Sequence, residues 1–499
     1  MSYLIALDQG TTSSRATLFT LQGEALAAAS RNFTQHYPKP GWVEHDALEI
    51  WESQLACLKE VLERGAVAAS QIAGIGITNQ RETTVVWERD TGLPLHPAIV
   101  WQDRRTAEFT ESLKREGVEP MVRERTGLLL DPYFSASKLS WLLQNVEGLR
   151  SRAERGEVCF GTIDSWLMFR LSGGGRHVTD LSNASRTMLF NIKTLEWDDE
   201  LLRLFDVPRS MLPEVLPSGS RFGLTSAGVV GAEIAITGVA GDQQAALFGQ
   251  GCFAPGMAKA TFGTGAFVVM NSGATLGTGE GVLTTIAWQL PGEAVQYALE
   301  GSIFIAGAAV EWLKEGLGMI GSAAEVEALA RSVPDTGGVY FVPALSGLGT
   351  PYWDPFARGV IAGLTRGSNR AHLARAALEA IAFQTVDAIR AMEKASGIAL
   401  RELRVDGGAA RNDLLLELQA DLLGAPVLRP RCTEITSLGA ALLAGIGAGV
   451  LDQGAIASHW ALDRRFEPVL AAARREELCR GWQRSVKLSL GWEKGEGAS

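Results

Sequence analysis

The sequence predicts an α/β fold built from two related halves. Apolar strands alternate with helical patterns through the first half, as at residues 3–7, 46–62 and 72–80. A strand, a turn rich in Gly, Thr and Ser, and a second strand open the chain, and the same pattern recurs from Ala258. Apolar residues make up 46% of the 499 residues and charged residues 20%, which is the composition of a folded globular protein.

The first half begins with two strands and a helix. The nearly continuous apolar run 3–7 predicts a buried strand, and the run 16–21 predicts its hairpin partner. Asp46 is expected to cap the next helix, with Glu49 three residues later completing a capping box. The apolar run 72–80 then predicts a second buried strand, so strand, helix and strand alternate.

Later elements follow the same logic. The run 235–240 predicts a short strand that leads into a helix, and 258–271 predicts a strand, a turn and a strand. A long helix is expected over about 371–394, and another is expected to end at Gly424, a favourable residue just past a helix end. With a boundary near 245–257, we expect two domains, 1–250 and 251–499.

Composition excludes several classes of protein. The formal net charge of −10 argues against non-specific binding to nucleic acid or to an anionic membrane. The most apolar stretch, 439–451, has 13 residues, short of the roughly 20 that span a bilayer. We expect it to be a small-residue helix packed inside a domain. The first residues show no signal-peptide pattern, and the five cysteines show no CxxC spacing, which favours a reducing, cytoplasmic location.

The string Asp-Gln-Gly-Thr-Thr-Ser-Ser-Arg at 8–15 is the most informative local sequence. Directly after a buried strand, it combines a carboxylate, a glycine, four hydroxyl groups and an arginine. Hydroxyl and backbone N–H groups in such a turn suit phosphate oxygens, Arg15 supplies positive charge, and Asp8 is placed to hold a metal ion. An ordinary hairpin turn has a similar composition, so both interpretations stay open.

A second turn of the same kind, Phe-Gly-Thr-Gly at 262–265, lies in the other half. One such turn in each half fits a nucleotide phosphate tail. The glycines at 407–408 follow a predicted strand and allow a close approach of the backbone to an adenosine group. A plain strand-to-helix turn explains them equally well.

Two polar sites follow predicted strands. Asp242 either acts as a helix cap or serves as a general base at the carboxyl end of a strand. Arg81 and Glu82 place donors beside an acceptor, the combination that a neutral polyol needs. An exposed ion pair is the alternative for these two residues.

Taken together, the motifs resemble the FGGY carbohydrate kinases, and within that family the members that phosphorylate glycerol. The matching strings run in order over about residues 3–450 and are LDQGTTSSR, YPKPGWVEHD, GITNQRETT, IVWQDRRTAE, DPYFSASK, NASRTMLFNI, GVAGDQQAALFGQ, FGTGAFVVMN, PALSGLGTPYWDP and RVDGGAARND. The resemblance implies two ribonuclease H-like domains of the actin, hexokinase and heat-shock ATPase type around a nucleotide cleft. It implies the reaction of ATP with glycerol to give sn-glycerol 3-phosphate and ADP, the first step of glycerol catabolism, with Mg²⁺.

The resemblance also assigns residues to roles. Catalysis is assigned to Asp242 as general base, with Arg15 and Asp8, and the magnesium of Mg-ATP to Asp8 and Asp242 through water. The substrate-binding set is Arg81, Glu82, Tyr133, Asp242 and Gln243, with Trp101 and Phe267 as an apolar wall or, alternatively, as core packing. The nucleotide-binding set is Thr11, Thr12, Ser13, Arg15, Thr264, Gly307, Glu311, Gly408 and Asn412. The resemblance further implies a homo-oligomer, either a dimer or a tetramer.

The sequence departs from the family pattern at two places. Glu311 stands where the family commonly has Gln, which changes the charge beside the nucleotide. The segment 222–234 contains neither Lys, Arg nor His, although some members use basic residues there for inhibition by fructose 1,6-bisphosphate and others a phosphorylated histidine. We therefore expect neither form of control through this segment.

Two alternative functions stay open. Another FGGY kinase would act on a pentulose or other sugar, and Trp101, Phe267 and Arg81–Glu82 favour a small triol instead. An actin-like or chaperone-like ATPase would leave the polyol-binding set unexplained, and the sequence shows no polymer-forming or peptide-binding segment.

Overall fold

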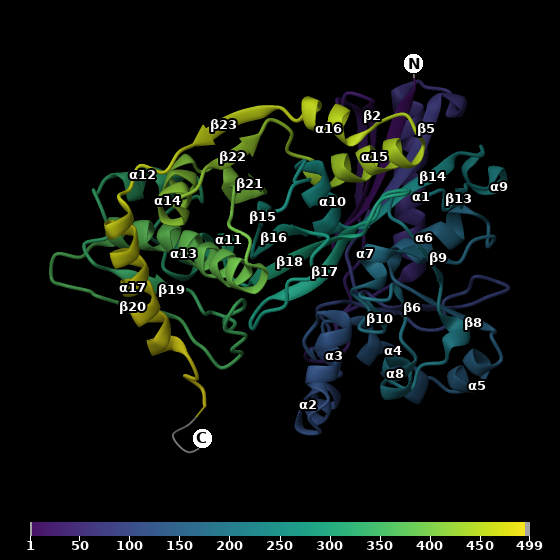
Figure 1. Ribbon diagram of the computed structural model, residues 1–499, viewed down its shortest axis with the longest axis horizontal. Helices are drawn as coiled ribbons and strands as arrows, with labels where there is room; N and C mark the ends of the chain where they lie inside the picture. Colours follow the sequence, from purple (N-terminus) through teal and green to yellow (C-terminus); the bar gives the residue numbers. More distant parts are fainter. Residues whose placement is uncertain (1, 495–499) are drawn as a thin grey trace. The chain divides into compact units, whose positions relative to one another are not determined.

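A computed structural model describes residues 2–494, which form two compact units (Figure 1). The first unit runs to Gly251 and includes Thr284–Tyr297 and Glu434–Trp460. The second comprises Cys252–Leu283, Ala298–Thr433 and the chain from Ala461 on. The predicted domains 1–250 and 251–499 are continuous, whereas here two segments beyond residue 250 belong with the first unit.

The first unit is built on a six-stranded mixed sheet in the order β13-β14-β5-β1-β2-β3. Strands β1, β5 and β14 run parallel to one another, while β1–β2 and β2–β3 are antiparallel. These strands are β1 (Tyr3–Gln9), β2 (Ser13–Thr20), β3 (Ala25–Asn32), β5 (Ile72–Asn79), β13 (Gly223–Leu224) and β14 (Ala235–Gly241). The predicted hairpin and the strands at 72–80 and 235–240 are confirmed.

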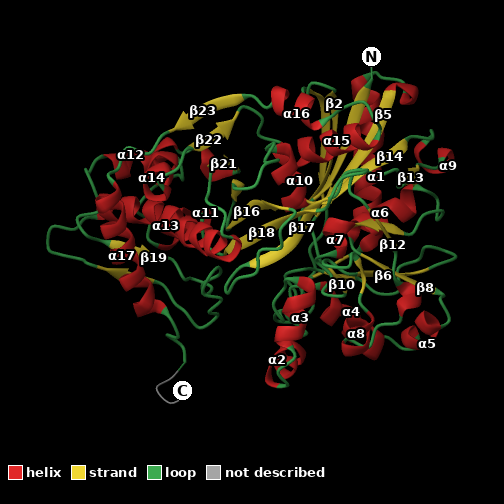
Figure 2. Ribbon diagram, in the orientation of Figure 1, coloured by secondary structure: helices red, strands yellow, loops and turns green. Residues whose placement is uncertain are grey.

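Helices cover this sheet (Figure 2). Helix α1 (Ala47–Gly65) packs on β2 and β3, and its N-terminus is capped by Asp46, which accepts from the amides of Leu48 and Glu49. The Glu49 carboxylate instead accepts from the amide and hydroxyl of Thr34, so the predicted use of Glu49 in a capping box is wrong. A tertiary partner replaces the local one.

Helix α15 (Ile435–Gly447) packs closely against β1, β5, β14 and α10 (Asp242–Gly249). A Cβ atom on Gly76 of β5 would lie 2.0 Å from the carbonyl oxygen of Ala440, and one on Gly439 would lie 1.8 Å from that of Ala245. Only glycine permits these approaches. The expected small-residue helix inside a domain is confirmed.

The first unit contains further short elements. Its other helices are α2 (Ala107–Arg115), α3 (Glu119–Thr126), α4 (Ser135–Asn145), α5 (Leu149–Glu154), α6 (Ile163–Leu171), α7 (Leu181–Ala184), α8 (Asp199–Leu204), α9 (Ala227–Val230) and α16 (Gln453–His459). Its small strands are β4 (Glu44–His45), β6 (Val85–Glu88), β7 (Ala98–Ile99), β8 (Val158–Gly161), β9 (Val178–Asp180), β10 (Phe190–Asn191), β11 (Glu196–Trp197) and β12 (Glu214–Leu216). Short 3₁₀ turns lie at Ala69–Gln71 and Arg209–Met211.

The second unit repeats the topology of the first. Its strands belong to a seven-stranded sheet in the order β17-β18-β16-β15-β21-β22-β23, with β15–β16 antiparallel and β15–β21 and β21–β22 parallel. The order β18-β16-β15-β21-β22 around β15 corresponds to the order β3-β2-β1-β5-β14 around β1 of the first unit. The α/β fold class and the related halves expected from the two strand–turn–strand patterns are confirmed.

The strands of this sheet are β15 (Met257–Phe262), β16 (Ala266–Gly273), β18 (Gln296–Ile303), β21 (Glu402–Asp406), β22 (Val427–Pro430) and β23 (Leu462–Phe466). Its helices are α11 (Gly307–Glu311), α12 (Glu325–Arg331), α13 (Arg370–Ser396), α14 (Asp413–Leu423) and α17 (Ala472–Ser489). The remaining elements of this unit are β19 (Tyr340–Val342), β20 (Val360–Ala362), a π-helical turn at Trp312–Gly316 and a 3₁₀ turn at Gly408–Arg411. The edge strand β17 (Leu283–Trp288) belongs, from Thr284 on, to the first unit. The predicted long helix is α13, and α14 ends at Gly424 as expected.

Across residues 2–494, none of the helices combines the length and the apolar content that crossing a bilayer requires. The five cysteines are free thiols.

Candidate active site

Three parallel strands of the first unit end at one edge of its sheet, and predicted site residues follow each of them. The register aligns Gln9 at the end of β1 with Asn79 at the end of β5, and Asn79 with Gly241 at the end of β14. Residues 81–82 come directly after β5, and Asp242 opens α10 directly after β14. Open α/β sheets bind ligands at such carboxyl ends, so the topology brings together side chains that are 160 residues apart.

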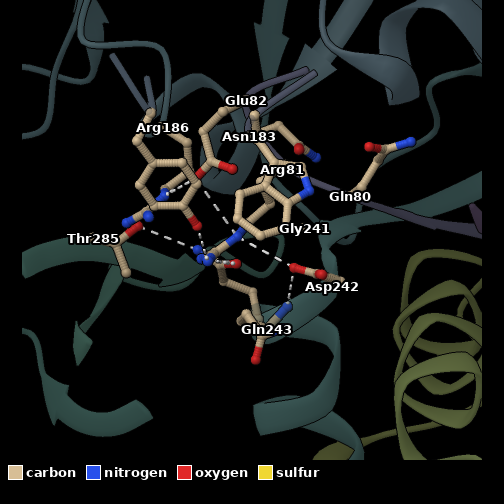
Figure 3. Close-up of polar contacts among 12 residues, drawn as sticks. Gln80, Arg81, Glu82, Asn183, Arg186, Gly241, Asp242, Gln243 and Thr285 are labelled. Atoms are coloured by element: carbon tan, nitrogen blue, oxygen red, sulfur yellow. Dashed lines mark hydrogen bonds and ion pairs between the residues drawn. The ribbon is translucent and has the colours of Figure 1, made fainter. Parts of the chain in front are cut away.

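The Arg81 guanidinium is the centre of this group (Figure 3). Its Nε lies 3.2 Å from Oδ1 of Asp242 and 3.8 Å from Oε1 of Glu82. Its Nη1 donates to Oε1 of Gln244 at 3.2 Å, and its Nη2 donates to the hydroxyl of Tyr133 at 3.4 Å. The side chains of Arg81 and Glu82 are 2% and 1% exposed, which rules out the alternative of an exposed ion pair.

We call Arg81, Glu82, Tyr133, Arg186, Asp242 and Gln244 the Arg81 cluster. Within it, Glu82 is held by Arg186, whose Nε donates to Glu82 Oε1 at 2.7 Å, and both side chains are buried. Glu82 has a φ of +62°, a left-handed conformation that costs free energy in a residue other than glycine. Hydrogen bonds from the hydroxyls of Thr84 and Ser135 to the Glu82 carbonyl hold this conformation in place.

Asp242 is partly accessible to solvent, with 34% of its side chain exposed. It is the first residue of α10, whose N-cap is Gly241, and its Oδ1 accepts from the backbone amide of Gln243 at 2.7 Å. A Cβ on Gly241 would lie 2.6 Å from Cδ of Arg81, so glycine makes room for the guanidinium stem. Asp242 is thus a carboxylate fixed from one side and open to solvent on the other.

A buried polar network fixes the backbone before Asp242. The amide of Gly241 donates to the hydroxyl of Ser182 at 3.0 Å, and that hydroxyl donates to Asp180 Oδ1 at 3.0 Å. Ser218 also donates to Asp180, at 2.7 Å. Burial raises the pKa of the Asp180 carboxyl, and these hydrogen bonds oppose the increase.

The predicted phosphate turn joins β1 to β2 in the first unit. The Gly10 amide closes it by donating to the Ser13 carbonyl at 2.9 Å, and Thr12 is exposed. Indole Nε1 of Trp101 donates to the Thr11 hydroxyl at 3.0 Å, and the Trp101 ring lies 5.5 Å from that of Tyr133. The turn and the Arg81 cluster are therefore connected through Trp101.

The charged residues of this turn have protein partners. The Arg15 guanidinium forms an ion pair with Glu434. The Ser437 hydroxyl of α15 donates to Oδ2 of Asp8 at 2.7 Å. Burial raises the pKa of the Asp8 carboxyl; Ser437 and Arg15 lower it, and the charge of Asp242 raises it further.

Asp8 and Asp242 fit the expected magnesium in their chemistry. Both offer the carboxylate oxygens that this ion prefers, and their mutual repulsion is the kind of interaction that a divalent cation relieves. Within residues 2–494, His, Cys, Asp and Glu side chains do not gather in groups of three or more that suit a metal ion. Two carboxylates match an ion that retains water and phosphate ligands.

In the second unit, the structure brings Thr264 and Gly307 together. The amides of Ala306 and Ala308 donate to the Thr264 carbonyl at 2.9 and 3.0 Å, and the Gly307 amide donates to that of Gly263 at 3.0 Å. A Cβ on Gly307 would lie 2.6 Å from the Gly263 oxygen, so this close approach requires glycine.

The other predicted residues of this unit have separate environments. A Cβ on Gly408 would meet no atom within 4 Å, while Asn412 caps α14 by accepting from the Leu415 amide at 2.9 Å. Glu311 pairs with Lys314 at 3.0 Å, which balances the charge that departs from the family pattern. Phe267 is half-buried in β16.

Sequence reasoning missed several residues that hold the proposed site residues in place. The sequence analysis assigns no role to Arg186, although an arginine within the mostly uncharged string NASRTMLFNI is itself a signal. It assigns no role to Gln244 or Ser437 either. Gln244 both accepts from Arg81 and donates to the Thr285 hydroxyl at 3.2 Å, and nothing local to these positions indicates that pairing.

Known proteins are similar to nearly the whole chain. The family model described as the FGGY family of carbohydrate kinases, N-terminal domain, matches residues 3–249, and the C-terminal domain of the same family matches residues 258–448. A glycerol kinase of Citrifermentans bemidjiense is 79% identical over 494 residues, covering 99% of this chain and all of that protein. A glycerol kinase of Thermus brockianus is 61% identical over 99% of both chains.

A solved structure agrees with these relatives. The crystal structure of Plasmodium falciparum glycerol kinase with ADP superposes with a TM-score of 0.94 at 34% identity, covering 98% of each chain. A xylulose kinase of Rhodospirillum rubrum has a TM-score of 0.86 at 26% identity, covering 97% of this chain and 98% of its own.

Proposed function

The chain belongs to the FGGY family of carbohydrate kinases, and we infer from this membership and from the Arg81 cluster that it transfers the terminal phosphoryl group of ATP to glycerol. The product is sn-glycerol 3-phosphate, and the reaction begins glycerol catabolism. Relatives that carry this activity in their names are 55–79% identical over nearly the whole chain. The observation that carries the proposal is the buried Arg81 fork, 3.2 Å from a solvent-accessible carboxylate.

We propose that the Arg81 cluster binds the glycerol hydroxyls. A triol both donates and accepts hydrogen bonds, so it needs donors such as Arg81 and Gln243 beside acceptors such as Glu82 and Asp242. The Tyr133 hydroxyl offers both functions. The polar groups are preorganised, because ion pairs and backbone contacts already hold Arg81 and Glu82. Trp101 and Phe267 are assigned to the carbon side of glycerol.

Asp242 is proposed as the general base. A primary alcohol is a weak nucleophile near neutral pH, so a carboxylate must accept its proton as the new oxygen–phosphorus bond forms. The proton passes from the glycerol hydroxyl to the Asp242 carboxylate, and ADP departs with the electrons of the broken bond. Arg81 keeps Asp242 in place through its 3.2 Å contact and balances its charge.

The phosphate and nucleotide contacts are proposed from the turns. Thr11, Thr12 and Ser13 supply hydroxyl and amide donors to the phosphates, and Arg15 supplies positive charge after exchanging its partner Glu434. Asp8 and Asp242 are assigned to magnesium through water, and the ion, when bound, neutralises the charge of the phosphates. The proposed nucleotide contacts in the second unit are Thr264, Gly307, Glu311, Gly408 and Asn412.

A substrate panel tests this function. Purified protein with Mg-ATP is assayed for ADP release with glycerol, xylulose, ribulose and erythritol at equal concentrations. We expect kcat/KM for glycerol to exceed that for each other substrate by at least about tenfold, since a site built around one small polyol leaves groups unpaired with others. A preference for a pentulose would replace glycerol with the alternative sugar substrate, and ATP hydrolysis unaffected by any polyol would favour the actin-like ATPase.

We place the reaction in the cytoplasm, which the five free thiols support because disulfides are rare in that compartment. The homo-oligomer, dimer or tetramer, is a prediction from the family resemblance. Light scattering coupled to size exclusion measures it.

A further inference from the structure

Tyr133, which is assigned to glycerol, lies on a short segment that has no regular secondary structure. The segment Asp131–Phe134 leads into α4, and its backbone carbonyls precede the helical hydrogen-bond pattern. Tyr133 has two contacts at the site: its hydroxyl accepts from Arg81 at 3.4 Å, and its ring lies 5.5 Å from that of Trp101. The conformation of this segment therefore sets the position of a glycerol contact.

Lys138, in the first turns of α4, binds that segment from within the protein. Its Nζ donates to the carbonyl of Pro132, to that of Tyr133 at 2.7 Å and to that of Phe134 at 3.2 Å. A lysine ammonium has three N–H donors, and here each has one backbone carbonyl. The Lys138 side chain is completely buried, so water does not compete for these bonds.

Lys138 is surrounded by charged groups, but its ammonium group donates its hydrogen bonds to backbone carbonyls. The charged groups that face it are Glu82, Asp103, Asp131 and Arg104. Burial lowers the pKa of Lys138 to about 7, and the three carboxylates oppose that decrease while Arg104 adds to it. Burying an ammonium group is costly unless its donors are satisfied, and these carbonyls satisfy them.

Other contacts complete the fixation of the segment. Asp131 Oδ1 accepts from the Tyr133 amide at 2.9 Å and from Arg104 at 2.8 Å. The Ser135 hydroxyl donates to the carbonyl of Glu82 at 2.9 Å, which ties the start of α4 to the Arg81 cluster. Of these groups, only Lys138 contacts three consecutive carbonyls of the chain around Tyr133.

We propose that Lys138 is a positioning residue for glycerol: by holding the carbonyls of residues 132–134, it fixes the Tyr133 side chain in the Arg81 cluster. This inference rests on the proposed function. Lys138 does not touch glycerol in this account and acts only through Tyr133. A merely structural lysine would stabilise the start of α4 without altering the affinity for one substrate.

The test compares steady-state constants of Lys138→Met with those of the wild type. We expect KM for glycerol to rise on the order of tenfold, the scale of losing a hydrogen-bonded contact, while KM for ATP stays within about twofold. Lys259→Met is the matched control, because it removes another fully buried lysine, from β15 of the second unit. It should leave KM for glycerol unchanged.

A double-mutant cycle with Tyr133→Phe tests the route of the effect. If Lys138 acts through Tyr133, Lys138→Met should raise KM for glycerol less in the Tyr133→Phe background than in the wild type. Lys138→Gln, which retains an amide donor, serves if the Met variant does not fold, and it should raise KM for glycerol selectively as well.

Two results would overturn the inference while leaving the function intact. One is a folded Lys138 variant with lower thermal stability but the wild-type KM for glycerol. The other is a full, additive effect in the Tyr133→Phe background. A wild-type protein inactive on glycerol would instead overturn the function and this inference together.

Discussion

Replacing Arg186 by Met should destabilise the protein strongly. The side chains of Arg186 and Glu82 are 0% and 1% exposed and are joined at 2.7 Å, so the substitution leaves a carboxylate buried without its main partner. Breaking a buried ion pair in this way costs about 3–5 kcal/mol. Because Arg81 Nε lies 3.8 Å from the same carboxylate and retains part of the neutralisation, we expect about 3 kcal/mol, the lower end.

Urea unfolding, followed by circular dichroism, measures this loss. Arg209→Met is the matched control, since Arg209 and Asp199 form a 2.7 Å ion pair whose side chains are largely exposed. Such a pair contributes less than about 1 kcal/mol. The double variant Glu82→Gln/Arg186→Met should recover part of the stability, because no charge is left stranded. An Arg186→Met loss no greater than that of the control would show that the buried Arg186–Glu82 pair does not stabilise the fold.

Three further predictions concern the glycerol site, a buried carboxyl group and regulation. Arg81→Ala should raise KM for glycerol by roughly one to two orders of magnitude, because it removes a buried donor worth about 1–3 kcal/mol, and it should change KM for ATP little. A shift mainly in KM for ATP would contradict the assignment of Arg81 to the glycerol hydroxyls. Burial raises the pKa of Asp164 from its usual value to about 7. The protonated Asp164 carboxyl is favoured in the folded protein, so the stability it contributes is complete below the unfolded pKa near 4 and is lost as the pH rises through 7. The thermal stability of Asp164→Asn relative to that of the wild type should therefore increase between pH 5 and 8. A difference that stays constant over this range would contradict the prediction. Fructose 1,6-bisphosphate should inhibit weakly or not at all in initial-rate assays, because residues 222–234 carry no Lys or Arg and only Arg221 borders them; saturable micromolar inhibition would show an effector site elsewhere.

Much of the fold could be predicted because its signals are local. The apolar run 3–7, the polar turn after it and the run 72–80 each carry their own pattern, and the structure has strands there. Glu49 shows the limit of such patterns. Its spacing from Asp46 indicates a capping box, yet its carboxylate binds Thr34, a residue that the local pattern does not include.

The sequence indicates the residues proposed to react, but it does not indicate the residues that hold them in place. Arg81 and Glu82 are adjacent in the sequence, but a charged pair is more often exposed, and only the parallel register of β5 and β14 shows why this one is buried. Arg186 lies 104 residues from its partner Glu82. Pairings over such distances depend on the tertiary fold, so no spacing rule reveals them.

In the proposed reaction, the Asp242 carboxylate accepts the proton of a glycerol hydroxyl during phosphoryl transfer. The most direct measurement is the single-turnover rate of Asp242→Asn with saturating Mg-ATP and glycerol, alongside the dissociation constant for ATP. We expect the rate to fall by about a hundredfold or more, with ATP affinity changed by no more than a few fold. An Asn variant that keeps most of the wild-type rate would contradict this role of Asp242.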